Sequence, residues 1–394
     1  MKELNVGMLG FGFMGRAHAY GYLNLPLFYD PVPLRARLHS VCTSSHDTAE
    51  RARALLGFET ACTDYREITE NAHVDIVHIC TPNKFHKEAL LSAMAHGKHI
   101  YCEKPLVVDA AEADEIERAL PGYRGVAQIV FHNRFFPATL QARRLVEEGF
   151  LGRPLSLRAA YLHSGSADPD APLKWKLSRE MGGGVIADLG SHVLDLVNHL
   201  VGDFEAIWCA TDVAYKDRPA ADGSGRRVPV EAEDAALMVV RVSGGGLGVI
   251  EASKIATGAL DELRFEIHGE KGAMRFNLMR PNWLEVYDNS KADGLRGWQA
   301  LDTVQSYPKP AVSFPSPKAS IGWLRAHLAS LHNFLDAVAR GEPVEPGLQQ
   351  AIYVQRVMEA ARISDKTGAW VDLGRSPFMR HRSRGWAATR AAGP

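Results

Sequence analysis

The hydrophobic and polar positions of the first 130 residues form short apolar runs that alternate with amphipathic stretches. The apolar runs are typical of strands buried on both faces, as in a parallel sheet covered by helices. The stretches between them have the period of a helix. This alternation predicts a doubly wound α/β domain, with strands at 4–9, 37–42, 74–80, 99–101 and 126–131 and helices at 14–25, 48–56, 84–96 and 110–120.

After residue 132 the pattern changes to β-like runs joined by short links. Links such as 243–246 and 269–272 have the composition of tight turns between antiparallel strands. This part predicts a second α/β unit with a largely antiparallel sheet. Its strands are expected at 155–162, 206–213, 235–242, 247–253, 262–268, 273–276 and 283–287, and its helices at 137–148, 184–201, 323–340 and 347–366.

A GxGxxG motif of Gly10, Gly12 and Gly15 directly follows the first predicted strand and opens the first helix. The first glycine permits a tight turn, the second lets the backbone approach a pyrophosphate, and the third allows close packing of helix and strand. The helix N-terminus, next to Phe13 and Met14, supplies amide donors for the phosphates. In this strand–helix context the motif predicts a Rossmann dinucleotide-binding domain.

The end of the second strand bears on the choice between NAD and NADP. NAD-binding domains carry an Asp or Glu there, which binds the ribose 2′-hydroxyl. Here Thr43 and Ser44 follow the strand, and their hydroxyls suit a 2′-phosphate that Arg51 or His46 would pair with. Asp47 is close enough to keep NAD open, so the sequence predicts NAD or NADP with a slight preference for NADP.

A second segment is expected at the crevice where the nicotinamide half of the cofactor binds. Thr81, Pro82 and Asn83 follow the strand 74–80; Pro82 fits a turn, and Asn83 is predicted to cap the next helix. His86 opens that helix and is a candidate on the cofactor side, although a helix-surface position is more typical than a catalytic one.

Lys104 follows the strand 99–101, directly after Glu103 and before Pro105. Glu103 and Lys104 are both expected beside the nicotinamide. There the Lys104 ammonium would hydrogen-bond a substrate hydroxyl and hold a developing alkoxide, which points to hydride chemistry on an alcohol or ketone. For this segment taken alone, a solvated surface lysine is the alternative.

A glycine triplet at 182–184 leads into a predicted helix on which Asp188, His192 and Asp195 fall at i, i+4 and i+7. Three polar groups on one face of an otherwise apolar helix need partners or a cavity. Histidine is the natural acceptor of an alcohol proton near neutral pH, and Asp188 would orient its ring or bind a second hydroxyl. A core histidine bonded to a neighbouring carbonyl is the alternative.

Two segments supply further candidates for substrate binding. The polar loop after the strand 155–162 carries one large aromatic residue, a combination common in sugar sites, although loops are also often just polar. An Asn-Arg pair at the end of the last strand of the first domain would face the same cleft, or the arginine would form an interdomain salt bridge. These candidates are Tyr161, His163, Trp175, Asn133 and Arg134.

Composition limits the classes of function. The formal net charge of −1 gives no reason to expect a nucleic-acid or anionic membrane partner. No stretch approaches the roughly 18 apolar residues of a membrane span, and we expect no signal segment. Five scattered cysteines without a CxxC pair suit reduced thiols rather than disulfides or a metal site. We therefore predict a cytoplasmic protein without metal, nucleic-acid or membrane partners.

With its motifs in order and well spaced, the chain resembles the Gfo/Idh/MocA family of oxidoreductases from residue 2 to about residue 373. The segments that carry the resemblance are GFGFMG, TPNxxH, GKHIYCEKP and GGGVIADLGSH. Within the family, residues 5–22 and 166–176 are most similar to members that oxidise anhydrosugars. The acid that the family usually carries after the second strand is missing, which puts only the cofactor preference in doubt.

The resemblance implies an N-terminal Rossmann domain and a C-terminal α/β domain with a large, open sheet that commonly builds homodimers or homotetramers. It implies NAD(P)-dependent oxidation of a sugar, inositol or similar polyol, or reduction of the matching ketone. Lys104 would be the catalytic lysine, with Asp188 and His192 as its carboxylate and histidine partners. Two alternatives remain: an NAD-dependent glycoside hydrolase that works by transient oxidation and elimination, and a non-catalytic NAD(P)-binding sensor.

The length of 394 residues exceeds what one hydrophobic core accommodates. We predict a dinucleotide-binding domain at 1–131 and a substrate-binding and oligomerisation domain at 132–373. The remaining 374–394, rich in basic and small residues, is predicted to be a poorly ordered tail.

Overall fold

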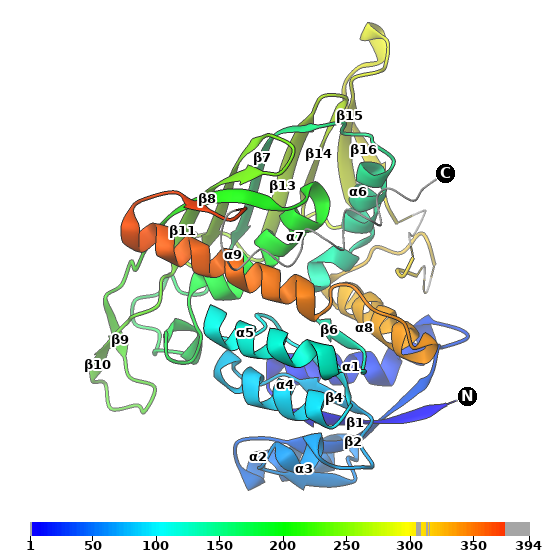
Figure 1. Ribbon diagram of the computed structural model, residues 1–394, viewed down its shortest axis with the longest axis vertical. Coiled ribbons are helices and arrows are strands. Elements are labelled where there is room, and N and C mark those ends of the chain that lie inside the picture. Colours follow the sequence, from blue (N-terminus) through cyan, green and yellow to red (C-terminus); the bar gives the residue numbers. More distant parts are fainter. Residues whose placement is uncertain (1, 305–308, 313, 315, 375–394) are drawn as a thin grey trace.

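The computed structural model describes residues 2–304, 309–312, 314 and 316–374. These residues form two lobes, each built around one large β-sheet (Figure 1). The predicted α/β class with two different sheets is confirmed. Apart from Gly374, the predicted tail lies outside the described residues. In the part of the chain that is described, no helix is both long and apolar enough to cross a membrane.

The first lobe is a six-stranded parallel sheet in the order β3-β2-β1-β4-β5-β6, which confirms the doubly wound domain. Two short elements, β3 and α3, were not predicted because three or four residues show no period. The strands are β1 (Glu3–Leu9), β2 (Arg35–Cys42), β3 (Thr60–Cys62), β4 (Ile76–Ile79), β5 (His99–Cys102) and β6 (Ala127–Ile129). One face packs on α1 (Phe13–Phe28) and α2 (His46–Leu56), the other on α3 (Arg66–Thr69), α4 (His86–Ala95) and α5 (Ala110–Ala119).

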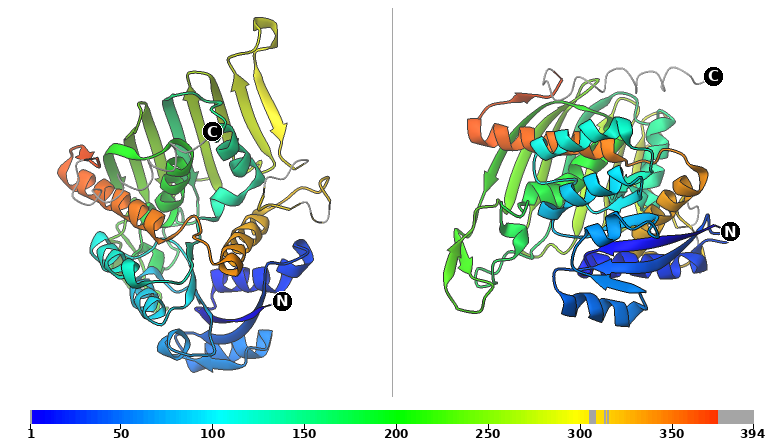
Figure 2. Two further views of the ribbon diagram at one scale, coloured as in Figure 1. Left: turned by 45° about the vertical axis from the view of Figure 1, so that its right-hand side comes forward. Right: turned by 60° about the horizontal axis from the view of Figure 1, so that its bottom comes forward.

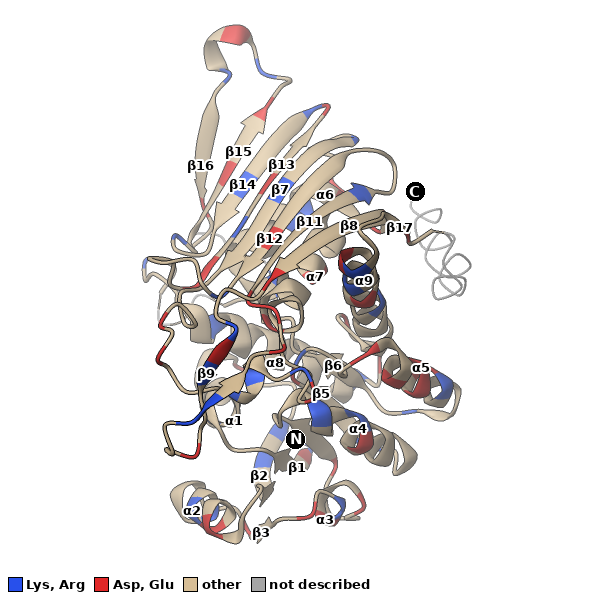
Figure 3. Cartoon of the chain, turned by 90° about the vertical axis from the view of Figure 1, so that its left-hand side faces the viewer, with Lys and Arg blue, Asp and Glu red and all other residues tan. Residues whose placement is uncertain are grey.

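The second lobe is a nine-stranded sheet in the order β16-β15-β14-β13-β7-β12-β11-β8-β17. It is mostly antiparallel, since only β7 and β12 pair in parallel. Its strands are β7 (Pro154–Leu162), β8 (Phe204–Asp212), β11 (Ala235–Val242), β12 (Leu247–Ser253), β13 (Glu262–Gly269), β14 (Gly272–Asn277), β15 (Trp283–Asp288), β16 (Trp298–Asp302) and β17 (Val371–Asp372). One face packs on α6 (Pro137–Glu147), α7 (Ser191–Val201) and α9 (Leu348–Thr367), and among the described residues no helix covers the other (Figures 2 and 3).

Two further parts of the second lobe were not predicted. A ribbon of β9 (Asp217–Pro219) and β10 (Arg227–Pro229) extends away from the sheet (Figure 1). At the edge of the sheet, β16 pairs with β15. These strands are short or largely exposed, so their sequences lack the alternating apolar positions that identify a half-buried strand.

The helix predicted at 184–201 begins with a different geometry. Ile186–Gly190 form a π-helical turn, and the α-helix α7 starts only at Ser191. A π-helical turn holds more residues than an α-helical one, so it shifts Asp188 out of the α-helical register with His192 and Asp195. Such turns are common at functional sites.

The first lobe is completed by a helix from the far end of the chain. α8 (Trp323–Arg340) lies against α1, and its apolar face joins the core formed by β1. The Phe334 ring packs against the ring of Tyr101 on β5, with centroids 5.1 Å apart. The core of the first lobe therefore includes residues far beyond 131, and the boundary after residue 131 stays a prediction.

Phe334→Ala tests how much this returning helix contributes to stability. The side chain is fully buried, so its removal should lower the free energy of unfolding by about 3–5 kcal/mol. Leu324→Ala on the exposed side of the same helix is the matched control and should change it by no more than about 0.5 kcal/mol. Chemical denaturation measures both, and equal losses would contradict the assignment of α8 to this core.

Candidate active site

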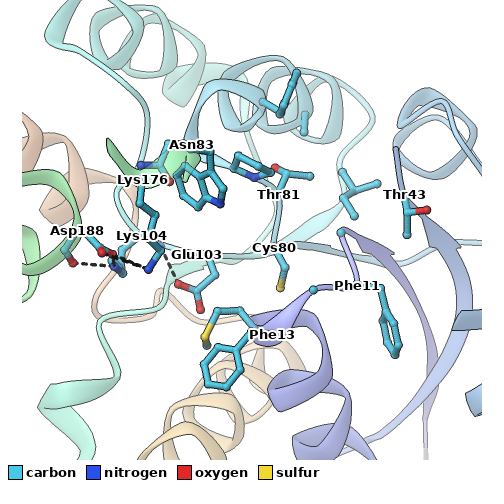
Figure 4. A pocket seen from close by; sticks show the side chains of 18 of the residues that line it. Phe11, Phe13, Thr43, Cys80, Thr81, Asn83, Glu103, Lys104, Lys176 and Asp188 are labelled. Carbon is cyan, nitrogen blue, oxygen red and sulfur yellow. Dashed lines mark hydrogen bonds and ion pairs between the residues drawn. The ribbon is translucent and has the colours of Figure 1, made fainter. Parts of the chain in front are cut away.

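A cavity of about 940 Å³ lies between the lobes, at the carboxyl ends of β1, β2, β4 and β5 (Figure 4). Its volume suits a small-molecule site. Four predicted site residues do not line it: Gly15, His86, Asn133 and Arg134. The predicted residues that do are Gly10, Gly12, Phe13, Met14, Thr43, Ser44, Thr81, Pro82, Asn83, Glu103, Lys104, Tyr161, His163, Trp175, Asp188 and His192.

The three glycines of the GxGxxG motif have separate structural reasons. Gly10 has a φ of +89°, and a Cβ there would lie 2.7 Å from the carbonyl oxygen of Cys80. A Cβ on Gly15 would lie 2.5 Å from the carbonyl oxygen of Gly10, so this glycine serves packing inside the lobe. A Cβ on Gly12 would meet nothing within 4 Å, although Gly12 lines the cavity. Gly12 is therefore the position that leaves room for a pyrophosphate at the start of α1.

The cavity end beside β2 has hydroxyl side chains. Thr43, Ser44 and Thr48 line it, and the Thr43 hydroxyl lies 2.5 Å from that of Thr48. Among the described residues, the carboxylates that line the cavity are Glu103, after β5, and Asp188 and Asp261, in the second lobe. No arginine of the described residues lines the cavity. Arg51 instead donates from Nε to the carbonyl of Asp47 at 3.3 Å. Neither the acid typical of NAD sites nor the predicted arginine therefore lines this end.

Two expectations for the segment after β4 are wrong. Asn83 does not cap the next helix, because its Nδ2 donates to the carbonyl oxygen of Gly182 at 2.7 Å and so joins the two lobes. His86 is not on the helix surface but fully buried. Its ring nitrogens lie 2.9 Å from the carbonyl oxygens of Thr81 and Pro105. His86 therefore holds two segments of the cavity wall in place from behind.

Lys104 and Asp188 meet across the lobes. The Lys104 ammonium donates to the carbonyl oxygen of Asp188 at 2.7 Å and to its Oδ1 at 3.0 Å (Figure 4). Lys176 lies 3.0 Å from Oδ1, and the buried Lys254 lies 3.3 Å from Oδ2. Burial alone would raise the pKa of Asp188, but these lysines, Lys104 foremost, hold it well below its usual value. Asp188 is thus an ionised carboxylate among three cations, and the sequence did not indicate Lys254.

His192 is held by rings rather than by Asp188. The rings of Tyr161, His132 and Phe131 surround it, with centroids 5.7, 5.1 and 6.1 Å away. No hydrogen bond joins it to Asp188, and among the described residues its buried Nδ1 has no partner. Burial, followed by the charge of Lys104, lowers the pKa of His192 well below 6.5. The ring is therefore neutral near neutral pH, and it is a weaker base than a free imidazole.

The predicted alignment of Asp188, His192 and Asp195 on one face is wrong. Asp195 accepts a hydrogen bond from Nε of Arg134 at 2.7 Å, away from the cavity. Asp188 and His192 both line the cavity, whereas Asp195 lies three residues beyond His192 on α7 and does not. Arg134 thus forms a buried salt bridge with Asp195, although both residues lie within the predicted second domain, and Asn133 is buried outside the cavity wall.

The glycine triplet allows the close approach that its sequence predicted. A Cβ on Gly183 would lie 2.5 Å from the carbonyl oxygen of Lys176, and one on Gly184 would lie 2.4 Å from the Glu233 carboxylate. Gly184 also has a φ of +112°, which side chains rarely adopt. The groups that approach these glycines belong to the protein and not to a ligand. The glycine triplet therefore determines the position of the π-helical turn that carries Asp188.

A buried histidine supports Glu103. Nε2 of His18, on α1, lies 2.7 Å from Oε1 of Glu103. The neighbouring rings of His132, His327 and Trp323 continue from His18 towards His192. Sequence reasoning missed these residues because they come from distant parts of the chain. The other lining residues it missed include Cys80, Phe85, Lys176, Asp261 and Trp323.

Gly12→Ala and Gly10→Ala separate the two uses of the glycines. Gly12→Ala should leave the melting temperature unchanged and weaken NAD binding at least about tenfold, because the added methyl group occupies only ligand space. Gly10→Ala should destabilise the fold itself by about 1–3 kcal/mol, since it adds both strain and a backbone clash. Calorimetric titration with NAD and thermal melts measure these effects. Unchanged NAD affinity in Gly12→Ala would contradict the assignment.

Two family models match the chain. The Gfo/Idh/MocA model described as "Oxidoreductase family, NAD-binding Rossmann fold" matches residues 4–130. The companion model, "Oxidoreductase family, C-terminal alpha/beta domain", matches residues 143–373. Together they cover both lobes and all the motifs on which the resemblance rests.

Individual relatives agree with these models. Levoglucosan dehydrogenase of Pseudarthrobacter phenanthrenivorans is 33% identical over 385 residues, 95% of this chain and 99% of that protein. A structure titled as levoglucosan dehydrogenase in complex with NADH and levoglucosan has a TM-score of 0.90 at 33% identity, covering 94% of this chain and 99% of that one. Myo-inositol 2-dehydrogenase of Thermotoga maritima is 27% identical over 74% of this chain and 81% of its own length. The chain belongs to the Gfo/Idh/MocA family of oxidoreductases.

Proposed function

We propose that the protein is an NAD(P)-dependent dehydrogenase that transfers hydride between the nicotinamide and a secondary hydroxyl of a sugar, anhydrosugar or inositol. The observation that carries this proposal is the meeting of Lys104, Asp188 and His192 in the cavity that also contains the GxGxxG loop. Relatives that are named as levoglucosan and inositol dehydrogenases support the same class of substrate.

The residues present fit a nicotinamide cofactor, because Gly12 leaves open space at the N-terminus of α1. When bound, the nicotinamide supplies the acceptor for the hydride. Lys104 uses its contacts with Asp188 to hold its ammonium at the cavity, where it stabilises an alkoxide as the hydroxyl loses its proton. His192 is the base: its neutral ring takes that proton. Asp188 keeps Lys104 in position through their ion pair, and it does not orient His192.

The choice between NAD and NADP rests on Thr43 and Ser44. Because no Asp or Glu directly follows β2, the sequence gave a slight preference for NADP. Arg51, which would pair with a 2′-phosphate, does not line the cavity. NADH complexes of levoglucosan dehydrogenase support NAD. We infer that NAD is accepted and that the hydroxyls of Thr43 and Ser44 would hold its ribose.

The two alternative functions predict different products. A glycoside hydrolase of the transient-oxidation type releases sugar without accumulating reduced cofactor, and a sensor does neither. The dehydrogenase accumulates reduced nicotinamide in proportion to the polyol consumed. Against the sensor, Lys104, Asp188 and His192 all lie at one cavity, a set that cofactor binding alone does not require.

Assay of a polyol panel with Lys104→Ala as the key variant tests this function. The panel contains levoglucosan, myo-inositol, scyllo-inositol and 1,5-anhydroglucitol, each with NAD and with NADP. Wild-type protein should reduce the cofactor with at least one of them. Lys104→Ala should lower kcat by about 10²–10⁴-fold, because the alkoxide loses its cation, with the Kd of NAD changed by no more than about threefold.

Lys84→Ala is the matched control for Lys104→Ala. Lys84 is an exposed lysine that does not line the cavity and pairs with Glu180. Its removal should leave kcat within about twofold of wild type. Near-normal activity of Lys104→Ala, or sugar release without reduced cofactor, would overturn the proposed dehydrogenase.

We further propose that the protein assembles as a homodimer or homotetramer through the open face of the large sheet. Leu237, Leu247 and Val249 on this face are 52%, 50% and 46% exposed. Val239 lies between Val249 and Trp208 in the strand register, so these apolar side chains are continuous across β8, β11 and β12. An exposed apolar patch of this kind favours a protein partner. Charged residues such as Arg241 and Glu251 lie on the same strands, and further charges lie along the neighbouring strands (Figure 3).

Val249→Lys tests this interface by placing a charge at the centre of the patch. Light scattering should give a lower mass for the variant than for the wild-type oligomer, because the lysine ammonium would be buried without a partner. Leu55→Lys, at an exposed leucine on α2, is the control and should leave the mass unchanged. A monomeric wild type, or a Val249→Lys variant with the wild-type mass, would refute the interface.

The cysteines support a reducing compartment, which we propose to be the cytoplasm. All five, Cys42, Cys62, Cys80, Cys102 and Cys209, are free thiols. Cys42 and Cys62 pair with each other in the register of β2 and β3, and they still form no disulfide. Proteins of oxidising compartments more often use disulfides.

A further inference from the structure

Asp261 lies in the cavity wall on the side of the second lobe. It ends the loop before β13, and Glu262, the next residue, pairs with Leu162 on β7. Because these strands are antiparallel, Asp261 lies beside His163, the residue after Leu162. The strand register therefore brings together three residues from two segments, Tyr161, His163 and Asp261, which we call the Asp261 cluster.

The Asp261 cluster uses only one of the two carboxylate oxygens. Tyr161 donates its hydroxyl to Oδ1 of Asp261 at 2.7 Å, and Nε2 of His163 lies 2.8 Å from the same Oδ1. The side chains of His163 and Asp261 are about one-third exposed, at 33% and 34%. Among the described residues, Oδ2 has no hydrogen-bond partner and is not buried. An acceptor oxygen is thus held at a fixed place and left open to a ligand.

The other carboxylate on this side of the cavity, Asp188, lacks such an open oxygen. Its Oδ1 accepts from Lys104 and Lys176, and its Oδ2 from Lys176 and Lys254. A carboxylate whose oxygens are bonded to cations is a weak acceptor for a further hydroxyl. Asp261, bonded on one oxygen to neutral donors or a histidine, keeps its acceptor capacity.

The Asp261 cluster is also connected to the reacting end of the cavity. The Tyr161 ring packs edge-on against His192, with centroids 5.7 Å apart, and against His163 at 5.0 Å. Tyr161 and Asp261 therefore line the same cavity as His192 and Lys104.

We propose that Asp261 is a specificity-determining residue that accepts hydrogen bonds from a hydroxyl, or from two neighbouring hydroxyls, away from the carbon that is oxidised. This inference rests on the proposed dehydrogenase function and names its substrate class more narrowly. The preferred substrate is a neutral cyclic polyol with a free hydroxyl at that end. A uronic acid, which carries a carboxylate there, is repelled by Asp261.

Asp261→Asn tests the proposal with the fastest substrate of the polyol panel and its monodeoxy analogues. The amide oxygen can still accept from Tyr161 and His163, so the fold should persist, which a thermal melt checks. The substitution should raise the KM of the full polyol at least about tenfold and leave kcat within about threefold, because the contact serves binding away from the reacting atoms. The Kd of NAD should not change.

The monodeoxy analogues give the decisive readout. For wild type, one analogue that is still oxidised should have a KM at least about tenfold above that of the full polyol. For Asp261→Asn, this difference should vanish, since the residue that recognises the missing hydroxyl is altered. The matched uronic acid should also become a better competitive inhibitor of the variant than of wild type.

Glu262→Gln is the matched control. Glu262 is the neighbouring residue, does not line the cavity and pairs with Arg264. It should keep both the wild-type KM and the selectivity between polyol and analogues. An Asp261→Asn variant with unchanged selectivity, or one that loses kcat for all substrates equally, would overturn the role of Asp261. Failure of the proposed dehydrogenase is a separate result, namely that wild type reduces no cofactor with any polyol.

Discussion

The ion pair between Lys104 and Asp188 is the interaction on which the site depends. Lys104 comes from the first lobe and Asp188 from the second, so the pair fixes the distance between the cofactor loop and the residues that meet the substrate. A buried ion pair gains little net stability, because both charges lose their hydration. Loss of Lys104 would leave Asp188 paired with Lys176 and Lys254, so no carboxylate would remain without a cation. The pair therefore contributes geometry more than stability.

The excess of positive charge around Asp188 also determines the protonation states. Lys104, Lys176 and Lys254 face one carboxylate, so the local charge is positive before a ligand binds. This charge and burial keep His192 neutral, the form that can take a proton. The same charge favours an alkoxide over a hydroxyl in the substrate. The same positive charge thus stabilises the alkoxide and at the same time weakens His192 as a base.

Sequence reasoning identified what depends on local pattern and missed what depends on register. The positions of most strands along the chain, the roles of Gly10 and Gly12, and the position of Lys104 at a strand end follow from short segments. The π-helical turn before α7 leaves no periodic signal. The predicted alignment with Asp195 failed because Asp195 pairs with Arg134 instead of facing the cavity. Asp261 could not be found either, because its meeting with His163 requires the pairing of β13 with β7.

Asp188 and Asp261 show how one chemical group acquires two roles from its surroundings. Asp188 is largely buried, with its side chain 14% exposed, and its oxygens are bonded to lysines, so its charge is used to hold Lys104. Asp261 is one-third exposed and bonded through a single oxygen, so its second oxygen is available to a ligand. Burial on its own would raise the pKa of Asp261, but hydrogen bonds from His163 and Tyr161 lower it below its usual value. Both carboxylates are therefore ionised near neutral pH. Among the described residues, they differ in the number of free acceptor oxygens: Asp188 has none and positions Lys104, whereas Asp261 has one, with which it would recognise a substrate hydroxyl.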